Sequence, residues 1–162
     1  MQKAVSKTMK NIVEAYGIAA RASKLNAQVR FEAFEKVISF CESDDVCSVA
    51  DTVQRNMLLF WAYNNLAEVK FAEKKYGDAL DLWYKSSSLL KESDAKIALG
   101  TKMLESADKG AFSIPEKAKR IFLIAGYLQE AYREKGDYES ASRLDRLKKT
   151  ADYLLHSSER KN

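Results

Sequence analysis

YNNLAEVKFAEKKYGDALDLWYKSSSLL, residues 63–90, is the stretch that decides the fold. Two segments with the three- and four-residue spacing of amphipathic helices meet in it at the corner KYGD, residues 75–78. The positions that would face each other are Tyr63, Leu66, Ala67 and Phe71 in the first segment, and Ala79, Leu82, Trp83, Ser86 and Leu90 in the second. Because the small side chains of Ala79 and Ser86 leave room for bulky neighbours, we expect two antiparallel helices packed at short range.

The rest of the chain has the composition of a helical domain. Of its 162 residues, 46% are hydrophobic and 31% are charged, a balance typical of globular proteins. One proline and six glycines leave few helix breakers, and β-branched residues nowhere alternate over a useful length. The sequence therefore predicts an all-α fold of about seven helices, forming a single domain over residues 1–162.

Several residues of the opening stretch lie at the spacings of a known repeat. They are Tyr63, Leu66, Ala67, Tyr76, Ala79, Trp83 and Ser86. In this pattern the chain resembles the tetratricopeptide repeat (TPR) family, whose first helix carries an aromatic, a leucine with a small residue, and a second aromatic. One position departs from the pattern, because the second aromatic is Phe71 and Lys70 occupies its usual place. The resemblance implies antiparallel hairpins stacked as a short TPR-like right-handed solenoid.

We expect the remaining helices to stack on either side of this hairpin. The predicted units are a degenerate hairpin at 4–42, a hairpin at 56–91, an insert helix at 94–109 and a hairpin at 117–155. The last unit contains a Gly136-Asp137-Tyr138 corner, which is characteristic of the family. A second register stays open, because part of the segment after residue 117 also fits a second-helix pattern paired with the preceding helix. The residues of that register are Ala118, Phe122 and Ala125, opposite Leu99 and Gly100.

Polar residues mark where several helices should begin. Asn26 is a predicted N-cap of the second helix, and Ser93 with the following aspartate is a predicted cap of the fifth. The clearest start is Ser113, because Pro115 follows in the first turn and Glu116 stands three residues after the serine.

The third helix should be long and buried on more than one side. It could begin at residues 43–45, or restart at a capping box led by Asp51. Two apolar stripes run along it, and we expect neighbouring helices to cover both. The stripes are Val53, Met57 and Phe60 on one side, and Leu59, Ala62, Leu66 and Val69 on the other.

Catalytic and metal-binding interpretations find little support. The single histidine, His156, follows Asp152 by four residues, a spacing typical of a pair on a helix surface. Two cysteines and one distant histidine cannot supply a tetrahedral metal site. We expect Cys41 and Cys47 to be buried or half-buried thiols, with a disulfide across a helix corner as the alternative. Gly126, inside an apolar helix, is interpreted as a close-packing position. The sequence therefore predicts no enzymatic activity, no cofactor and no metal.

Charge and hydropathy argue against two other classes of partner. The net charge of +4 is modest, and acidic residues interrupt the basic clusters of the last two helices. Those clusters are Lys117, Lys119 and Arg120, and Arg143, Arg146, Lys148 and Lys149. The longest apolar runs fall far short of the roughly 18 residues of a membrane span, and the first residues lack the apolar core of a signal peptide. We therefore expect neither nucleic-acid binding nor a membrane span, and we predict a cytoplasmic location.

The resemblance also implies where a partner would bind. In TPR proteins the first helix of each pair lines a concave groove that receives a peptide or a helix of another protein. The corresponding residues here are Trp61, Asn64, Glu68 and Phe71 in the middle hairpin, and Tyr127, Glu130 and Arg133 in the last hairpin. We predict a non-enzymatic protein–protein interaction module: an adaptor, a chaperone or a regulator. The alternatives are a nucleic-acid-associated regulator that uses the basic last two helices, and a homodimeric structural protein.

Overall fold

The computed structural model describes residues 7–22, 26–42 and 49–159, and all regular structure in these ranges is α-helical. Its helices are α1 (Lys7–Ala22), α2 (Ala27–Cys41), α3 (Val49–Ala72), α4 (Tyr76–Ser87), α5 (Ser93–Lys109), α6 (Ile114–Lys135) and α7 (Tyr138–Glu159). The prediction of an all-α chain with seven helices is thus confirmed for the described residues.

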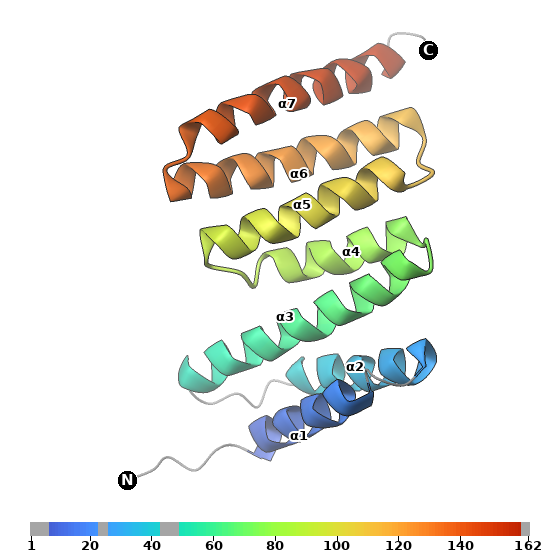
Figure 1. Cartoon of the computed structure of the whole chain (residues 1–162), viewed down its shortest axis with the longest axis vertical. Helices are drawn as coiled ribbons and strands as arrows, with labels where there is room; N and C mark the ends of the chain where they lie inside the picture. The colour runs from blue at the N-terminus through green and yellow to red at the C-terminus, as the bar shows by residue number, and fades with distance from the viewer. Residues whose placement is uncertain (1–6, 23–25, 43–48, 160–162) are drawn as a thin grey trace.

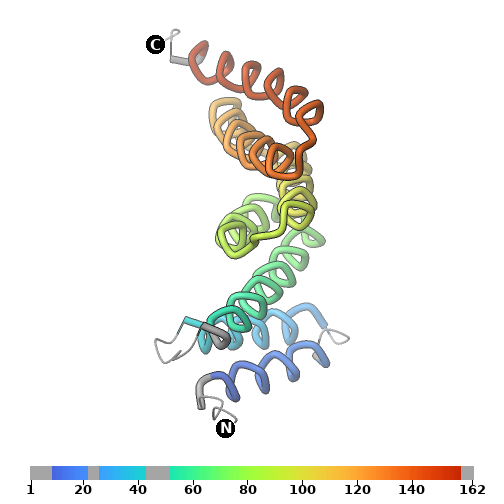
Figure 2. Tube along the Cα trace, turned by 90° about the vertical axis from the view of Figure 1, so that its left-hand side faces the viewer, coloured from blue at the N-terminus to red at the C-terminus, as the bar shows by residue number. Residues whose placement is uncertain are grey.

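The helices form one elongated stack in chain order (Figure 1). Each packs on the next, and consecutive helices run in opposite directions. Helix α1 also contacts α3, while α6 packs on both α5 and α7. A view turned by 90° places α1 and α7 at opposite ends of the stack (Figure 2). The sequence leaves open whether the sixth helix pairs with the fifth or with the seventh. In the structure α6 packs on both α5 and α7.

Of the N-caps predicted for the second, fifth and sixth helices, two are confirmed and one is wrong. The side chain of Asn26 accepts a hydrogen bond from the backbone N–H of Val29 at 2.9 Å. Ser113 accepts one from the N–H of Glu116 at 3.3 Å, with proline in the first turn of α6. In α5, however, the N-cap is Glu92, so Ser93 already lies inside the helix. The extended backbone conformation of an N-cap is found at Glu92, one residue before the predicted cap.

Helix α3 begins at Val49, so it does not restart at the capping box predicted for Asp51. The alternative start at residues 43–45 lies outside the described residues, as does Cys47 with the disulfide considered for it. Cys41, at the end of α2, is buried.

Two hydrophobic cores meet along α3. The first core consists of Met9, Ile12, Ala15, Ala19, Phe34, Val37, Cys41, Leu58, Ala62 and Leu66. The second core consists of Ala67, Ala79, Leu80, Trp83, Leu99, Met103, Ala107, Ile124 and Leu128. The adjacent residues Leu66 and Ala67 thus belong to different cores, because successive positions of a helix point about 100° apart.

The hairpin of α3 and α4 packs through the small side chains that the sequence indicated. Ala79 and Ser86 are fully buried, and Trp83 lies between them with its ring centroid 5.9 Å from that of Phe71. The Ser86 hydroxyl donates to the carbonyl of Trp83 within the same helix at 2.9 Å, so its burial leaves no polar group unsatisfied.

Glycines mark one close contact and one open position. A Cβ atom added to Gly100 of α5 would lie 2.5 Å from Leu128 Cδ2, so the missing side chain lets α5 and α6 approach closely. A Cβ atom added to Gly126 would meet nothing within 4 Å. The interpretation of Gly126 as a close-packing position is therefore wrong, because this side of α6 has no neighbour at that point.

Candidate functional site

A hollow of about 470 Å³ opens between α3 and the connection from α4 to α5. We call it the α3 hollow. It is lined by Thr52, Val53, Asn56, Met57, Phe60 and Trp61 of α3, and by Leu89, Leu90, Lys91, Glu92 and Ala95 of the connection and the start of α5. Most of these side chains are apolar, so the hollow suits aliphatic or aromatic groups of a ligand.

Three large apolar side chains of α3 line this hollow in a row and remain exposed. Val53, Met57 and Trp61 follow one another at four-residue steps and are 58%, 44% and 39% exposed. The expectation that neighbours would cover both stripes of the third helix is therefore wrong for Val53 and Met57, whereas Phe60 of the same stripe is partly buried against the second core. The reason is length: α4 has 12 residues and α3 has 24, so α4 cannot cover the whole of its partner.

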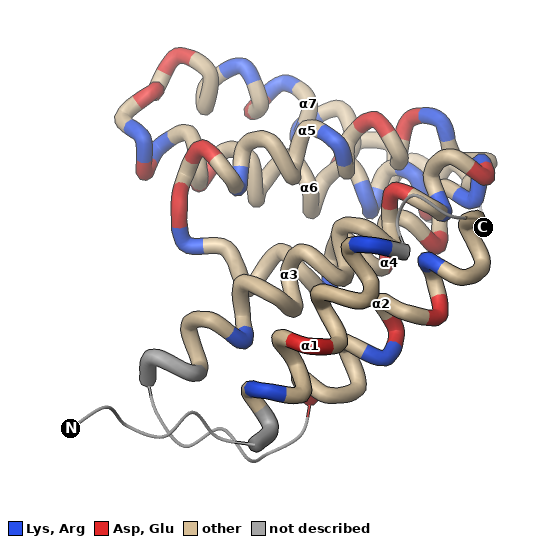
Figure 3. The backbone as a smooth tube through the Cα atoms, turned by 60° about the horizontal axis from the view of Figure 1, so that its bottom comes forward, with Lys and Arg blue, Asp and Glu red and all other residues tan. Residues whose placement is uncertain are grey.

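The hollow is almost free of charge along α3. Arg55 is the one charged residue of the sequence between residues 52 and 67, and Lys91 and Glu92 stand on the opposite wall. The tube of α3 is accordingly mostly uncoloured by charge in Figure 3. Trp61 packs against Tyr16 of α1, with the two ring centroids 5.6 Å apart. The arrangement offers apolar contact with little electrostatic steering.

Three of the predicted site residues lie together on the second half of α3, where they contact other parts of the chain. The Asn64 side-chain oxygen accepts a hydrogen bond from the indole N–H of Trp83 at 3.0 Å, and its amide donates to Glu68 at 3.4 Å. Glu68 also forms an ion pair with Lys102 of α5 at 3.0 Å. Asn64 is thus engaged in joining α3 to α4, which leaves less of it to hold a ligand backbone.

Phe71 completes this part of α3 as one wall of a smaller hollow of about 200 Å³. Its ring lies edge-on to that of Tyr76, with centroids 5.2 Å apart, and the Lys109 amino group stands 5.1 Å from its centroid. The other lining residues are Glu68, Trp83, Lys102 and Glu105. The charged residues of this hollow are paired, Glu68 with Lys102 and Glu105 with Lys109, in contrast to the apolar α3 hollow.

The remaining predicted residues lie on α6, whose packing partners are α5 and α7. The Tyr127 hydroxyl donates to the carbonyl of Ser87, at the end of α4, at 3.2 Å. Burial, with a smaller contribution from the carboxylate of Glu134, raises the pKa of Tyr127 to about 12. Glu130 and Arg133 are exposed. The structure therefore brings Asn64, Glu68 and Phe71 together, places Trp61 in the neighbouring hollow, and sets the α6 residues apart.

Sequence reasoning did not select the residues that make the α3 hollow apolar. Val53 and Met57 belong to an apolar stripe in the sequence, and such a stripe predicts an internal contact as readily as an open surface. Leu89 and Leu90 follow the last residue of α4, where an apolar pair in a connection between helices could have indicated a second wall.

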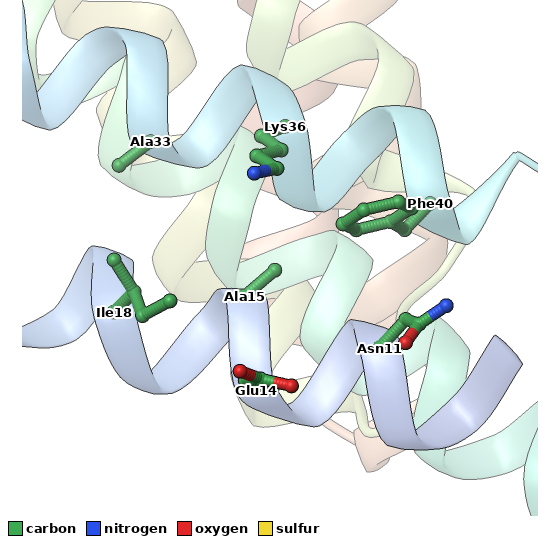
Figure 4. A pocket seen from close by; sticks show the side chains of 7 residues that line it. All are labelled: Asn11, Glu14, Ala15, Ile18, Ala33, Lys36 and Phe40. Carbon is green, nitrogen blue, oxygen red and sulfur yellow. The ribbon is translucent and has the colours of Figure 1, made fainter. Parts of the chain in front are cut away.

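A further hollow of about 200 Å³ lies between α1 and α2 at one end of the stack (Figure 4). Ala33, Lys36 and Phe40 of α2 face Ala15 and Ile18 of α1 across it, and Asn11 and Glu14 complete the lining. It is smaller than the α3 hollow and mixes charged with apolar groups, so we regard it as the weaker candidate.

The described residues show no cluster typical of a metal centre. Nowhere in ranges 7–22, 26–42 and 49–159 do three His, Cys, Asp or Glu side chains converge as metal ligands would. The pair of Asp152 and His156 is exposed on α7 at 3.1 Å, the surface pair that its spacing indicated. Burial raises the pKa of the Cys41 thiol to about 11, which keeps it protonated at neutral pH. No helix in these ranges combines the length and the apolar character needed to cross a bilayer.

Comparison of the chain with models of protein families, with curated proteins and with solved structures finds no match. The resemblance to TPR proteins accordingly rests on the sequence, on the residues of the opening hairpin and of the Gly136-Asp137-Tyr138 corner.

Proposed function

We propose that the chain is a non-enzymatic protein–protein interaction module, built as a short TPR-like right-handed stack of hairpins, that holds an apolar segment of another protein in the α3 hollow. The proposal keeps the predicted class of adaptor, chaperone or regulator. Of the predicted site residues it keeps Trp61, and it moves the contact from Asn64, Glu68 and Phe71, and from the residues on α6, toward the start of α3. The observation that supports it is the exposed row of Val53, Met57 and Trp61 facing an apolar wall across a hollow of about 470 Å³.

The energetics favour a ligand with apolar side chains. Covering apolar surface contributes roughly 25 cal/mol per Å², and three partly exposed large side chains offer such surface here. The row from Val53 to Trp61 extends over eight residue steps of helix, or about 12 Å, enough for two or three side chains of a peptide or a helix. Glu68 and Lys102 continue the same side of α3 toward α5 and would border the ligand with a pair of opposite charges.

Site-specific photo-crosslinking tests the proposal directly. A benzophenone amino acid is introduced at Met57, which lines the hollow, and in a matched variant at Leu123, which is 53% exposed on α6 away from it. Both variants are irradiated in cells that express the chain, and the crosslinked peptides are identified by mass spectrometry. We expect position 57, and not position 123, to crosslink to one apolar segment of another protein, and Met57→Glu to abolish that partner's binding.

Other outcomes would overturn it. Crosslinks from position 57 to the chain itself, together with a dimer in light scattering, would favour the homodimeric alternative. Equal crosslinking at both positions, or none at position 57, would exclude the hollow as a binding site. Nucleic-acid binding that falls with salt and with Arg146→Glu and Lys149→Glu would favour the other alternative. Lys148 is unsuitable for that control, because it donates to Gln129 and stands over the Phe122 ring.

A further inference from the structure

A second apolar slot lies between the start of α6 and the end of α7, far along the stack from α3 (Figure 1). Its volume is about 350 Å³, and it is lined by Ile114, Lys117, Ala118, Ile121, Leu147, Thr150, Ala151 and Leu154. Ile114 is 67% exposed and Leu154 is 38% exposed, so both stand at an open mouth. Exposed aliphatic groups beside a concave surface are typical of a docking site.

Basic side chains continue one edge of this slot along α7. Thr150 lines the slot, and Arg146 and Arg143 follow at steps of four and three residues toward the start of the helix, so all share one edge. The two arginines line a neighbouring hollow together with Glu139 and Ser142. A strip that is apolar at one end and basic at the other therefore runs along α7.

The carboxylates near this strip already have partners. Glu139 pairs with Arg143 at 2.6 Å, and Asp108 lies 3.9 Å from the amino group of Lys117. Glu116 pairs with Arg120 and Asp152 with His156, both at the sides of the strip. Arg146 is exposed, and within the described residues no carboxylate lies at ion-pair distance from it. A ligand carboxylate can therefore pair with Arg146 alone, and a second one can share Arg143 with Glu139.

We propose that this strip docks an amphipathic helix of a partner protein that carries aliphatic side chains at one end and acidic side chains at the other. Arg146 and Arg143 precede Leu154 by eight and eleven residues, or about 12 and 16 Å along the helix axis. The partner helix, lying along α7, would place two aliphatic residues one turn apart in the slot and its acidic residues two to three turns away. The inference is independent of the α3 hollow and concerns a different face.

The geometry favours a helix over the other anionic partners. A concave slot accepts discrete side chains, whereas a lipid bilayer presents a flat surface. Positive and negative residues are interleaved along α7 (Figure 3), and a phosphate backbone would meet both. An acidic group placed over Arg143 and Arg146 avoids Asp108, the exposed carboxylate at the other end of the strip, and the one carboxylate that lines the arginine hollow, Glu139, is already paired with Arg143.

Two designed peptides test the proposal with the full chain. Both are capped alanine-rich helices with leucines at positions i and i+4; one carries glutamates at i+8 and i+11, on the same helix face as the leucines, and the other carries lysines there. Their binding is followed by fluorescence anisotropy. We expect the glutamate peptide to bind at least about tenfold more tightly than the lysine peptide, with Leu154→Glu and Arg146→Glu each weakening it about tenfold. Arg146→Glu should also improve binding of the lysine peptide.

The control variants distinguish loss of binding in the slot from a general effect of added charge or of unfolding. Leu123→Glu adds the same charge to an exposed position of α6 outside the slot and should leave binding unchanged; circular dichroism of each variant checks that its helices are intact. Equal affinity for the two peptides, or no binding of the glutamate peptide, would overturn the proposal. So would binding of anionic vesicles or duplex DNA that survives Leu154→Glu and is not displaced by the glutamate peptide.

Discussion

The first core, at α1, α2 and the middle of α3, and the second core, from the end of α3 to α6, are held together by different interactions. In the first core, large side chains meet directly: Phe34 is buried, and its ring centroid lies 6.0 Å from that of Tyr16. Polar contact lies at the edge, where Arg30 donates to the Asn65 side chain at 2.6 Å. Stability in this half therefore depends on filling space.

In the second core, side chains bond to the backbone of neighbouring helices. The Ser106 hydroxyl of α5 donates to the carbonyl of Tyr76 in α4 at 2.9 Å. Tyr84 and Tyr127 reach the carbonyls of Arg120 and Ser87 at 3.4 and 3.2 Å. The carbonyl of Ser87, at the end of α4, has no partner inside its own helix, so the tyrosine satisfies it. Bonds of this kind fix how far each helix slides along the next, which apolar contact alone does not.

The largest effect that separates the two cores should come from Phe34→Ala. Removing this buried ring leaves a cavity, and we expect a loss of about 3–5 kcal/mol in the free energy of unfolding, measured by urea denaturation. Hydrogen exchange should show protection lost first in α1 and α2. Met103→Ala in the second core is the matched variant, with the loss in α4–α6 instead. Equal loss along the whole chain in both variants would mean that the two cores unfold as one unit.

The next effect compares two glycines within the C-terminal half. Gly100→Ala places a Cβ atom 2.5 Å from Leu128 Cδ2, and we expect a destabilisation of about 1–3 kcal/mol. Gly126→Ala meets nothing within 4 Å and should stabilise by about 0.5–1 kcal/mol, because alanine favours the helix. Thermal melts of both variants give the signs. A neutral Gly100→Ala would indicate that Leu128 moves aside freely and that the close approach of α5 and α6 is not a constraint.

The contrast between these glycines also shows what the sequence could predict. The α3–α4 hairpin was predictable because its evidence is local: small Ala79 and Ser86 alternate with large Trp83 within a few turns, and all three are buried. The same reasoning fails for Gly126, since a glycine in an apolar helix has the same sequence pattern whether a neighbour fills the space beside it or not.

The α3 hollow was unpredictable for a related reason. The stripe of Val53 and Met57 is apolar, which is equally consistent with burial and with a binding surface. The stripe stays open because α4 ends at Ser87 and is half as long as α3. The position of the connection that follows α4 also decides whether the stripe is covered. Helix ends are the least certain part of a sequence-based assignment, and here one helix end decides whether a surface is open.

A smaller effect tests the polar bonds of the second core. Ser106→Ala removes the donor to the Tyr76 carbonyl while keeping the volume of the buried site nearly constant. We expect a loss of about 1 kcal/mol in the free energy of unfolding by urea denaturation. Ser142→Ala, at an exposed position of α7, is the matched control and should change it by less than about 0.5 kcal/mol. If both serines behave alike, the bond does not contribute and the two cores are more similar than their contacts suggest.

The smallest effect at neutral pH, and the one with a distinctive pH dependence, concerns Tyr127. Burial raises its pKa from the ordinary 10.0 to about 12, so the hydroxyl ionises in the unfolded chain before it ionises in the folded one. Its contribution to stability is therefore fully present below pH 10 and is lost as the pH rises toward 12. Tyr127→Phe removes this dependence together with the bond to Ser87. We expect the stability difference between the native chain and the variant, from urea denaturation, to be constant between about pH 8 and 9 and to shrink by about pH 11. A difference that stays the same at about pH 11 would mean that the hydroxyl is as accessible in the folded chain as in the unfolded one, and the second core would lose one of the bonds that distinguish it from the first.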